Sequence, residues 1–183
     1  MAVLGAGSVF AAVAAPARAA TLPDGDLAYL RLLIGAELLG ADFYANAAAA
    51  QPYGGAAARD LTVALANERA HYASLAAILT GAGQVAATAG DIDFSYPKGS
   101  FATTGAVTKL AVELETLFLA TYLGAAGGVQ AVSLAQPIAQ IAANQAQHLA
   151  VFSRLLGRSA FKAAMPAPLA VEAATQALAA YTS

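Results

Sequence analysis

An internal repeat of acid, tyrosine, amide and histidine residues restricts the fold of this chain more than any other feature. In the first copy a glutamate stands seven residues before a tyrosine, and a later glutamate stands three residues before a histidine. The second copy keeps both spacings 77 or 78 residues further on, with glutamine in place of the later acid. The eight positions are Glu37, Tyr44, Glu68 and His71, and then Glu115, Tyr122, Gln145 and His148. Because residues three or seven apart share one helix face, the repeat predicts two similar helical hairpins whose polar groups meet at the centre of a bundle.

The composition supports a single all-helical domain without thiol chemistry. The chain has 183 residues, of which 59% are hydrophobic, many of them alanine, and only 11% are charged. Alanine is the strongest helix former, and this length is enough for one sizeable core. No cysteine is present, so a metal site would have only nitrogen and oxygen ligands. The net charge of −2 indicates neither a nucleic-acid partner nor binding to anionic lipid.

Helix-breaking residues divide the chain into four long helices and one short one. The expected helices cover residues 24–50, 57–80, 104–126, 133–157 and 168–181. We expect Asp24 or Asp26 to cap the first helix, and Ser133 with Gln136 forms a capping-box pattern at the fourth. The connection over residues 83–103 is long enough to cross the bundle, whereas the loops within each hairpin are short. The prediction is an all-α four-helix bundle with one long crossover connection and a short C-terminal fifth helix.

The first twenty residues differ from the rest and have the pattern of a secretory signal peptide. Residues 1–16 are uncharged, mostly small and apolar, and residues 17–19 have the small-x-small form of a signal-peptidase site. The basic segment that normally begins such a peptide is missing, so the peptide is truncated or its start is misassigned; the alternative is an N-terminal tail. We expect residues 1–20 to be a signal peptide, residues 21–183 to be the bundle domain, and the protein to be exported to the periplasm or the medium.

A long stretch without charged side chains raises the alternative of a membrane protein. Residues 116–153 contain no Asp, Glu, Lys or Arg, which is long enough for a span. The stretch is interrupted by two consecutive glycines and Pro137, contains Asn144 and five glutamines, and has no basic asymmetry at its flanks. We therefore expect no integral membrane span in the mature protein.

Three glutamates lie on helix faces that are otherwise apolar. The residues one turn away from Glu37, Glu68 and Glu115 are mostly hydrophobic or small, and no lysine or arginine shares these faces. Glu113, by contrast, has Lys109 one turn before it and is expected to face solvent. An unpaired buried charge is strongly destabilising, so a bound cation is the simplest compensation. Carboxylate and imidazole ligands suit one or two ions of iron or manganese, with zinc a less favoured choice.

These positions resemble the metal site of the ferritin-like superfamily, whose di-iron centres take a Glu and a Glu-x-x-His from each half of the bundle. Residues 68–71 match the Glu-x-x-His motif in full, the two single glutamates match, and the tyrosines two turns later match as well. Residues 93–102 and 121–126 are similar to the branch that contains desiccation-related plant proteins and many exported bacterial proteins of unassigned role. The likeness covers about residues 24–182. It implies metal ligands at Glu37, Glu68, His71, Glu115, Gln145 and His148.

Gln145 departs from the family pattern, in which most members carry a bridging carboxylate at this position. A neutral amide bridges two ions poorly, so we expect a weaker second ion or a single ion. Gln145 would then be a weak ligand or a hydrogen-bond donor to the ligands. Tyr44 and Tyr122 are expected to pack and hydrogen-bond rather than to take part in redox chemistry.

Two functions are consistent with this sequence. The first is an oxidase-type enzyme that reacts bound Fe(II) or Mn(II) with dioxygen or peroxide, giving ferroxidase or peroxide-detoxifying activity. The second is a non-catalytic envelope or stress protein of the desiccation type, in which the metal site is degenerate. The sequence leaves open which of these applies, and whether the chain forms a homo-oligomer.

Overall fold

Five α-helices and one 3₁₀ helix make up the fold in a computed structural model that describes residues 21–161 and 165–183. The elements are α1 (Asp24–Ala50), α2 (Gly55–Gly81), η1 (Ala89–Asp91), α3 (Thr104–Gly128), α4 (Val132–Leu155) and α5 (Val171–Ala179). The predicted all-α fold is confirmed, and the long helices begin and end within about two residues of the expected positions. The signal peptide expected at residues 1–20 lies outside the described residues.

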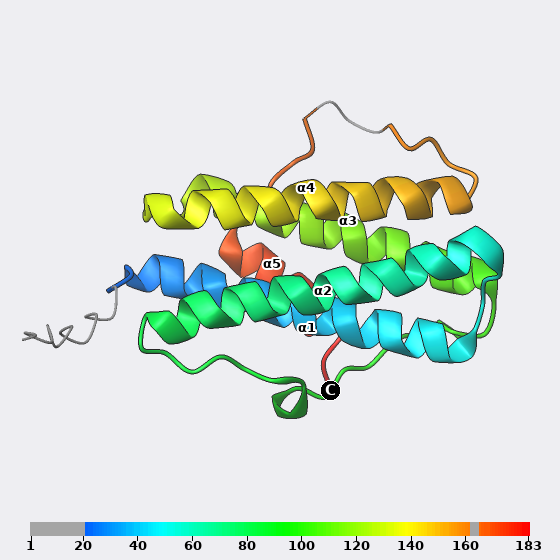
Figure 1. Cartoon of the computed structure of the whole chain (residues 1–183), viewed down its shortest axis with the longest axis horizontal. Coiled ribbons are helices and arrows are strands. Elements are labelled where there is room, and N and C mark those ends of the chain that lie inside the picture. The colour runs from blue at the N-terminus through cyan, green and yellow to red at the C-terminus, as the bar shows by residue number, and fades with distance from the viewer. Residues whose placement is uncertain (1–20, 162–164) are drawn as a thin grey trace, which may run out of the picture.

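The four long helices form a bundle of two closely packed pairs, α1 with α2 and α3 with α4, and the two pairs contact each other less extensively. α1 packs against α2 and α3, and α4 packs against α3 and α2. The connection from α2 to α3 runs back along the whole bundle (Figure 1), so α3 begins at the end of the bundle where α2 also begins. Each neighbouring pair is therefore antiparallel, as expected for a bundle with one long crossover connection.

The C-terminal segment is fastened to α3 and to the crossover connection. The backbone N–H of Leu169 donates to the carbonyl of Ala120 on α3 at 2.9 Å. This approach requires Gly124, because a Cβ atom at that position would lie 1.7 Å from the carbonyl oxygen of Leu169. α5 then packs against α1 and α3, and Phe94 and Thr182 form an isolated antiparallel bridge. The fifth helix therefore closes the α1–α3 side of the bundle.

Asp26 caps a different helix from the one that the sequence suggested. α1 begins after Pro23 without a side-chain cap, so the predicted capping of this helix by Asp24 or Asp26 is wrong. The Asp26 carboxylate is fully buried and accepts the backbone N–H groups of Gln130 and Ala131, both at 2.8 Å. These groups lie directly before α4. Asp26 therefore accepts hydrogen bonds from backbone N–H groups at the start of a helix about 105 residues away in the sequence.

The predicted capping box of the fourth helix is also wrong. α4 begins one residue earlier, at Val132, with Ala131 as its N-cap and no side-chain cap bond. Ser133 therefore lies inside the first turn, where its hydroxyl does not occupy the capping position. The buried Asp26 supplies the acceptor that the capping box was expected to supply.

One helix, α3, is long and apolar enough by length and composition to cross a membrane. Among the described residues it is the one helix of this kind, and 56% of its most apolar 18-residue segment is buried inside the bundle. α3 forms one corner of the bundle and is also covered by α5. Its apolar character is accordingly that of a core helix.

Candidate metal centre

Four polar side chains from four helices meet in the dry interior of the bundle. Glu37 on α1, Glu68 on α2, Glu115 on α3 and Gln145 on α4 each have no exposed surface. Each stands near the middle of its helix, on the face that also carries the hydrophobic core. These polar groups are buried because they share a helix face with hydrophobic residues one turn away.

Glu68 is shared by two groups of potential metal ligands. One group consists of Glu37, Glu68 and His71, and the other of Glu68, Glu115 and His148. Within each group the ligand atoms all lie within 4.8 Å of one another. The structure thus brings together all six residues that the sequence singled out, with one acid between two acid–imidazole pairs.

Both imidazoles turn the Nδ1 atom toward the carboxylates. His71 Nδ1 lies 3.1 Å from Glu37 Oε2 and 3.9 Å from Glu68 Oε2. His148 Nδ1 lies 3.0 Å from Glu68 Oε1 and 3.2 Å from Glu115 Oε1. Because the ligand atoms of each group lie close together, each group can offer a cation a mixed carboxylate and imidazole environment.

The two tyrosines of the repeat hold the single glutamates from the opposite helix. The Tyr44 hydroxyl on α1 donates to Glu115 Oε1 on α3, and the Tyr122 hydroxyl on α3 donates to Glu37 Oε1 on α1. Both rings are buried. The packing and hydrogen-bonding positions expected for the tyrosines are therefore observed, and the exchange follows the pseudo-two-fold relation between the hairpins.

Gln145 occupies the place of the fourth acid and acts as a donor to two of the others. Its Nε2 lies 3.3 Å from Glu37 Oε1 and 3.2 Å from Glu68 Oε2. An amide in this position lowers the negative charge of the cluster by one and bridges the two carboxylates with N–H groups. In this arrangement Gln145 orients the candidate ligands, which agrees with the donor role considered from the sequence.

Protons balance part of the charge of this cluster. Burial, reinforced by the nearby Glu68 charge, raises the pKa of Glu37 well above its usual range. Burial raises the pKa of Glu115 to about 7. Burial acts in the same direction on Glu68, but contacts with His148 and His71 outweigh it and lower its pKa to about 2. The pKa of His148 rises to about 10, because bonds to Glu115 and Glu68 outweigh the effect of burial.

Several buried atoms of the cluster lack partners that a cation would supply. Glu115 Oε2 and Gln145 Oε1 are buried without a hydrogen-bond partner, and Glu68 Oε1 has only its ionic contact with His148. Across the described residues, no lysine or arginine forms an ion pair with any of the three glutamates. Buried polar atoms without partners are rare and destabilising. The donor set therefore fits one or two divalent cations.

Gly40 and Asn67 shape the centre and were not singled out by the sequence analysis. A Cβ atom on Gly40 would lie 2.9 Å from Glu68 Oε2, so the glycine on α1 makes room for the shared acid. Asn67 Nδ2 lies 3.1 Å from His148 Nε2, on the side of the ring away from the carboxylates. The repeat contained a signal for Asn67, because Asn144 precedes Gln145 as Asn67 precedes Glu68.

The acid expected to face solvent does so. Glu113 has 52% of its side chain exposed and lies 3.9 Å from Lys109 one turn away. It shares α3 with Glu115, only two residues further along. The two glutamates form a natural pair for comparison, because one belongs to the buried cluster and the other to the surface.

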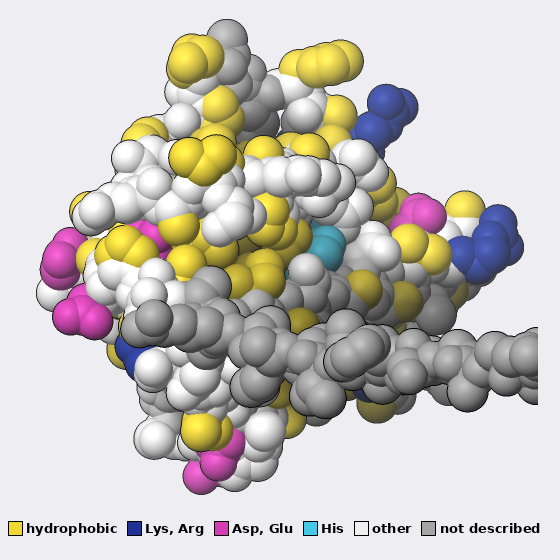
Figure 2. All heavy atoms as spheres, turned by 60° about the vertical axis from the view of Figure 1, so that its left-hand side comes forward, with side chains coloured by type: hydrophobic (Ala, Val, Ile, Leu, Met, Phe, Trp, Pro, Cys, Tyr) yellow, Lys and Arg dark blue, Asp and Glu magenta, His cyan; other side chains and the backbone are white. Residues whose placement is uncertain are grey.

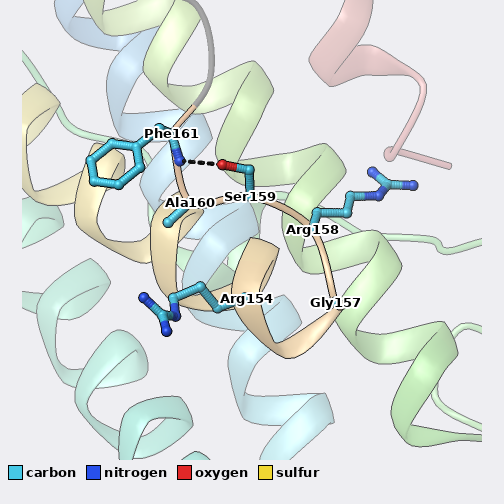
Figure 3. Close-up of a pocket in the computed structure, with 6 residues that line it drawn as sticks. All are labelled: Arg154, Gly157, Arg158, Ser159, Ala160 and Phe161. Carbon is cyan, nitrogen blue, oxygen red and sulfur yellow. Dashed lines mark hydrogen bonds between the residues drawn. The ribbon is translucent and has the colours of Figure 1, made fainter.

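One depression on the surface is unrelated to this cluster. It has a volume of about 420 Å³ and lies beyond the C-terminal end of α4, lined by Arg154, Arg158, Phe161 and their neighbours. The two guanidinium groups point away from each other (Figure 3), so they do not converge on a common anion. The buried carboxylate and imidazole cluster remains the best candidate for chemistry.

A four-helix bundle with one crossover connection and a central carboxylate–imidazole cluster is an architecture in which helical proteins can build metal sites between their helices. The particular family follows from the sequence, since the ferritin-like domain family matches residues 25–158. The chain belongs to this family, as the resemblance had indicated. A comparison with curated proteins gives no match.

Proposed function

We propose that this protein binds one or two iron or manganese ions at the central cluster and uses them to reduce dioxygen or peroxide. The observation that carries the proposal is the position of Glu68 between two acid–imidazole pairs in a fully buried interior. The side chains themselves cannot supply the electrons for this reduction, whereas iron or manganese bound to such ligands can. Glu37, Glu68, His71, Glu115 and His148 are the proposed ligands, and Gln145 is a weak ligand or a donor to them.

The side chains around the cluster have three further tasks in this proposal. The Tyr44 and Tyr122 hydroxyls fix the outer carboxylates in place. Asn67 faces the remote nitrogen of His148 and orients the ring. The buried helix faces exclude bulk water from the centre.

Metal analysis of protein purified without chelator and loaded with Fe(II) or Mn(II) tests the proposal. We expect between one and two ions per chain, a lower metal content in Glu115→Ala, which removes a ligand from one of the two groups, and normal binding in Glu113→Ala. The second variant is a matched control, because it removes an acid from the exposed side of the same helix. A content below about 0.2 ion per chain in the unmodified protein would reject metal binding.

Oxidase activity is a separate part of the proposal and needs its own assay. Loaded protein should consume dioxygen or peroxide in proportion to bound metal, and Glu115→Ala should lower this consumption while Glu113→Ala retains it. Stoichiometric metal binding without consumption of either oxidant would leave the site intact and refute the catalytic role.

The amide at position 145 favours a second candidate, a non-catalytic envelope or stress protein with a degenerate site. Gln145 donates to two carboxylates and so reduces the repulsion that metal would otherwise relieve. Glu68→Ala separates the two functions. In a degenerate site, loss of a buried charge should raise the melting temperature; in a working site, the variant should lose both metal and metal-dependent stabilisation.

Export is proposed on the pattern of residues 1–20 alone. Expression of the full chain in a bacterial host should yield a periplasmic or secreted form that begins at residue 20 or 21. N-terminal sequencing of the fractionated protein measures this directly. An unprocessed chain confined to the cytoplasmic fraction would contradict it.

A further inference from the structure

Two surface pockets, both between α2 and α4, each reach one imidazole of the central cluster and are called openings below. These helices lie side by side along one side of the bundle (Figure 1). The first, here called the His71 opening, has a volume of about 200 Å³ and is lined by Ala70, His71, Ser74, Pro137, Gln140 and Ile141. The second, the His148 opening, has a volume of about 150 Å³; its lining includes Asp60, Val63, Asn67, Asn144, Gln147 and His148.

The two openings are copies of each other under the internal repeat. A shift of 77 residues carries Val63 onto Gln140, and His71 onto His148. The same shift carries Asp60 onto Pro137. The two openings are therefore lined by equivalent positions of the two hairpins. The pseudo-two-fold relation that applies to the cluster also applies to the openings.

Each opening reaches one of the two ligand groups. The side chain of His71 is 13% exposed and that of His148 is 8% exposed, whereas the three glutamates have no exposed surface. Histidine atoms reach the molecular surface among hydrophobic side chains (Figure 2). The imidazoles are thus the part of the cluster that solvent contacts first.

The lining of the two openings differs in charge and in oxygen ligands. The His148 opening carries the Asp60 carboxylate and three side-chain amides, and Asn144 Oδ1 is buried there without a hydrogen-bond partner. The His71 opening has Pro137 where its counterpart has Asp60, and no carboxylate lines it. Hard divalent cations prefer carboxylate and carbonyl oxygens, and a single negative charge at an opening raises the local cation concentration.

We propose that divalent cations reach the cluster through the His148 opening, where Asp60 captures the hydrated ion and Asn144 Oδ1 receives it below. From there the ion passes to the group formed by Glu68, Glu115 and His148. The uncharged His71 opening is left for neutral molecules. This inference rests on the proposed metal binding, and it adds a route and two residues that are not proposed ligands.

A pair of symmetry-related variants tests the route. Val63, which is 56% exposed, and Gln140, which is also exposed, occupy equivalent positions at the two mouths. Val63→Trp places a large ring over the His148 opening, and Gln140→Trp does the same at the His71 opening. The probe is Co(II) alone, mixed with metal-free protein in a stopped-flow instrument and followed by its visible absorption.

We expect Val63→Trp to slow the filling of the site by about tenfold or more, with the final Co(II) content unchanged, and Gln140→Trp to fill at about the normal rate. Asp60→Asn should slow filling several-fold at low salt, and the difference from the unmodified protein should vanish at high salt. The asparagine is nearly the same size at an exposed position, so this variant reports on charge even if a tryptophan disturbs the fold.

Equal filling rates in Val63→Trp and the unmodified protein, or a larger effect from Gln140→Trp, would overturn the proposed route while leaving metal binding intact. A salt-independent effect of Asp60→Asn would also overturn it. Absence of Co(II) uptake by the unmodified protein at equilibrium would refute metal binding itself, and the route with it. The final content and the filling rate therefore distinguish the two failures.

Discussion

Metal binding at the central cluster should displace protons. Burial, reinforced by the nearby Glu68 charge, raises the pKa of Glu37 well above its usual range and so favours its protonated form. His148 carries a proton because its pKa is about 10, and Glu115, with a pKa of about 7, is half protonated. Glu68 is already ionised, since its pKa is about 2. Ligation requires carboxylates and a free imidazole nitrogen, so full loading should release more than one proton per chain at pH 7.

Isothermal titration calorimetry measures this release. The observed enthalpy of Mn(II) binding is plotted against the ionisation enthalpy of several buffers at one pH, and the slope is the number of protons released. At pH 8.5 Glu115, whose pKa is about 7, is already ionised, so the slope should be smaller than at pH 7. Binding should therefore tighten as the pH rises from 6 to 8.

A matched variant and a clear contrary result complete the test. Glu113→Ala should release the same number of protons as the unmodified protein, because this acid is exposed and lies outside the cluster. A release below about one proton per chain at pH 7 would refute the account of how the metal-free site balances its charge. Tight binding with no pH dependence would refute it equally.

Three further outcomes are expected. In the metal-free protein the contacts of His148 with the two glutamates contribute stability that is fully present below pH 6.5 and is lost as the pH rises toward about 10, so chemical denaturation should show a falling free energy of unfolding over this range. A stability that rises over this window would contradict the assignment. Gly40→Ala places a methyl group 2.9 Å from Glu68 Oε2, so the metal content should fall while the helical circular dichroism signal is retained. A normal metal content would show that Glu68 has room to move. Gly124→Ala brings a Cβ atom within 1.7 Å of the carbonyl oxygen of Leu169 and should destabilise the protein by about 1–3 kcal/mol. In the control Gly127→Ala the new Cβ atom meets nothing within 4 Å, so no such destabilisation is expected. Equal melting temperatures for the two variants would argue against the close approach.

The parts of the fold that follow helical periodicity were predictable from the sequence. The apolar faces and the breaker residues fixed the four long helices to within about two residues at most ends. The spacing between the two copies of the repeat also predicted that Glu37 and Glu115 would meet Glu68 in the interior, as they do. These predictions succeed because each depends on which side of one helix a residue occupies.

The parts that depend on contacts between distant segments were not predictable. Nothing near Asp26 in the sequence indicates that it accepts N–H groups before α4, and the local rule assigned it to its own helix instead. The room that Gly40 leaves for Glu68 depends on the approach of two helices, and a single sequence does not contain that distance. Tertiary structure overrides the local preference in both cases.

The difference between the two copies of the repeat explains why the site is asymmetric. Glu68 accepts contacts from both imidazoles, whereas Gln145, its counterpart, donates to Glu37 and Glu68. Replacing one shared acid with an amide removes one negative charge and leaves a single carboxylate able to contact both ions. Gln145→Glu should therefore raise the Mn(II) content toward two ions per chain if a second ion is limited by charge. The same variant should also raise the repulsion among buried acids and lower the melting temperature of the metal-free protein, so a gain in metal content without that loss would contradict this explanation.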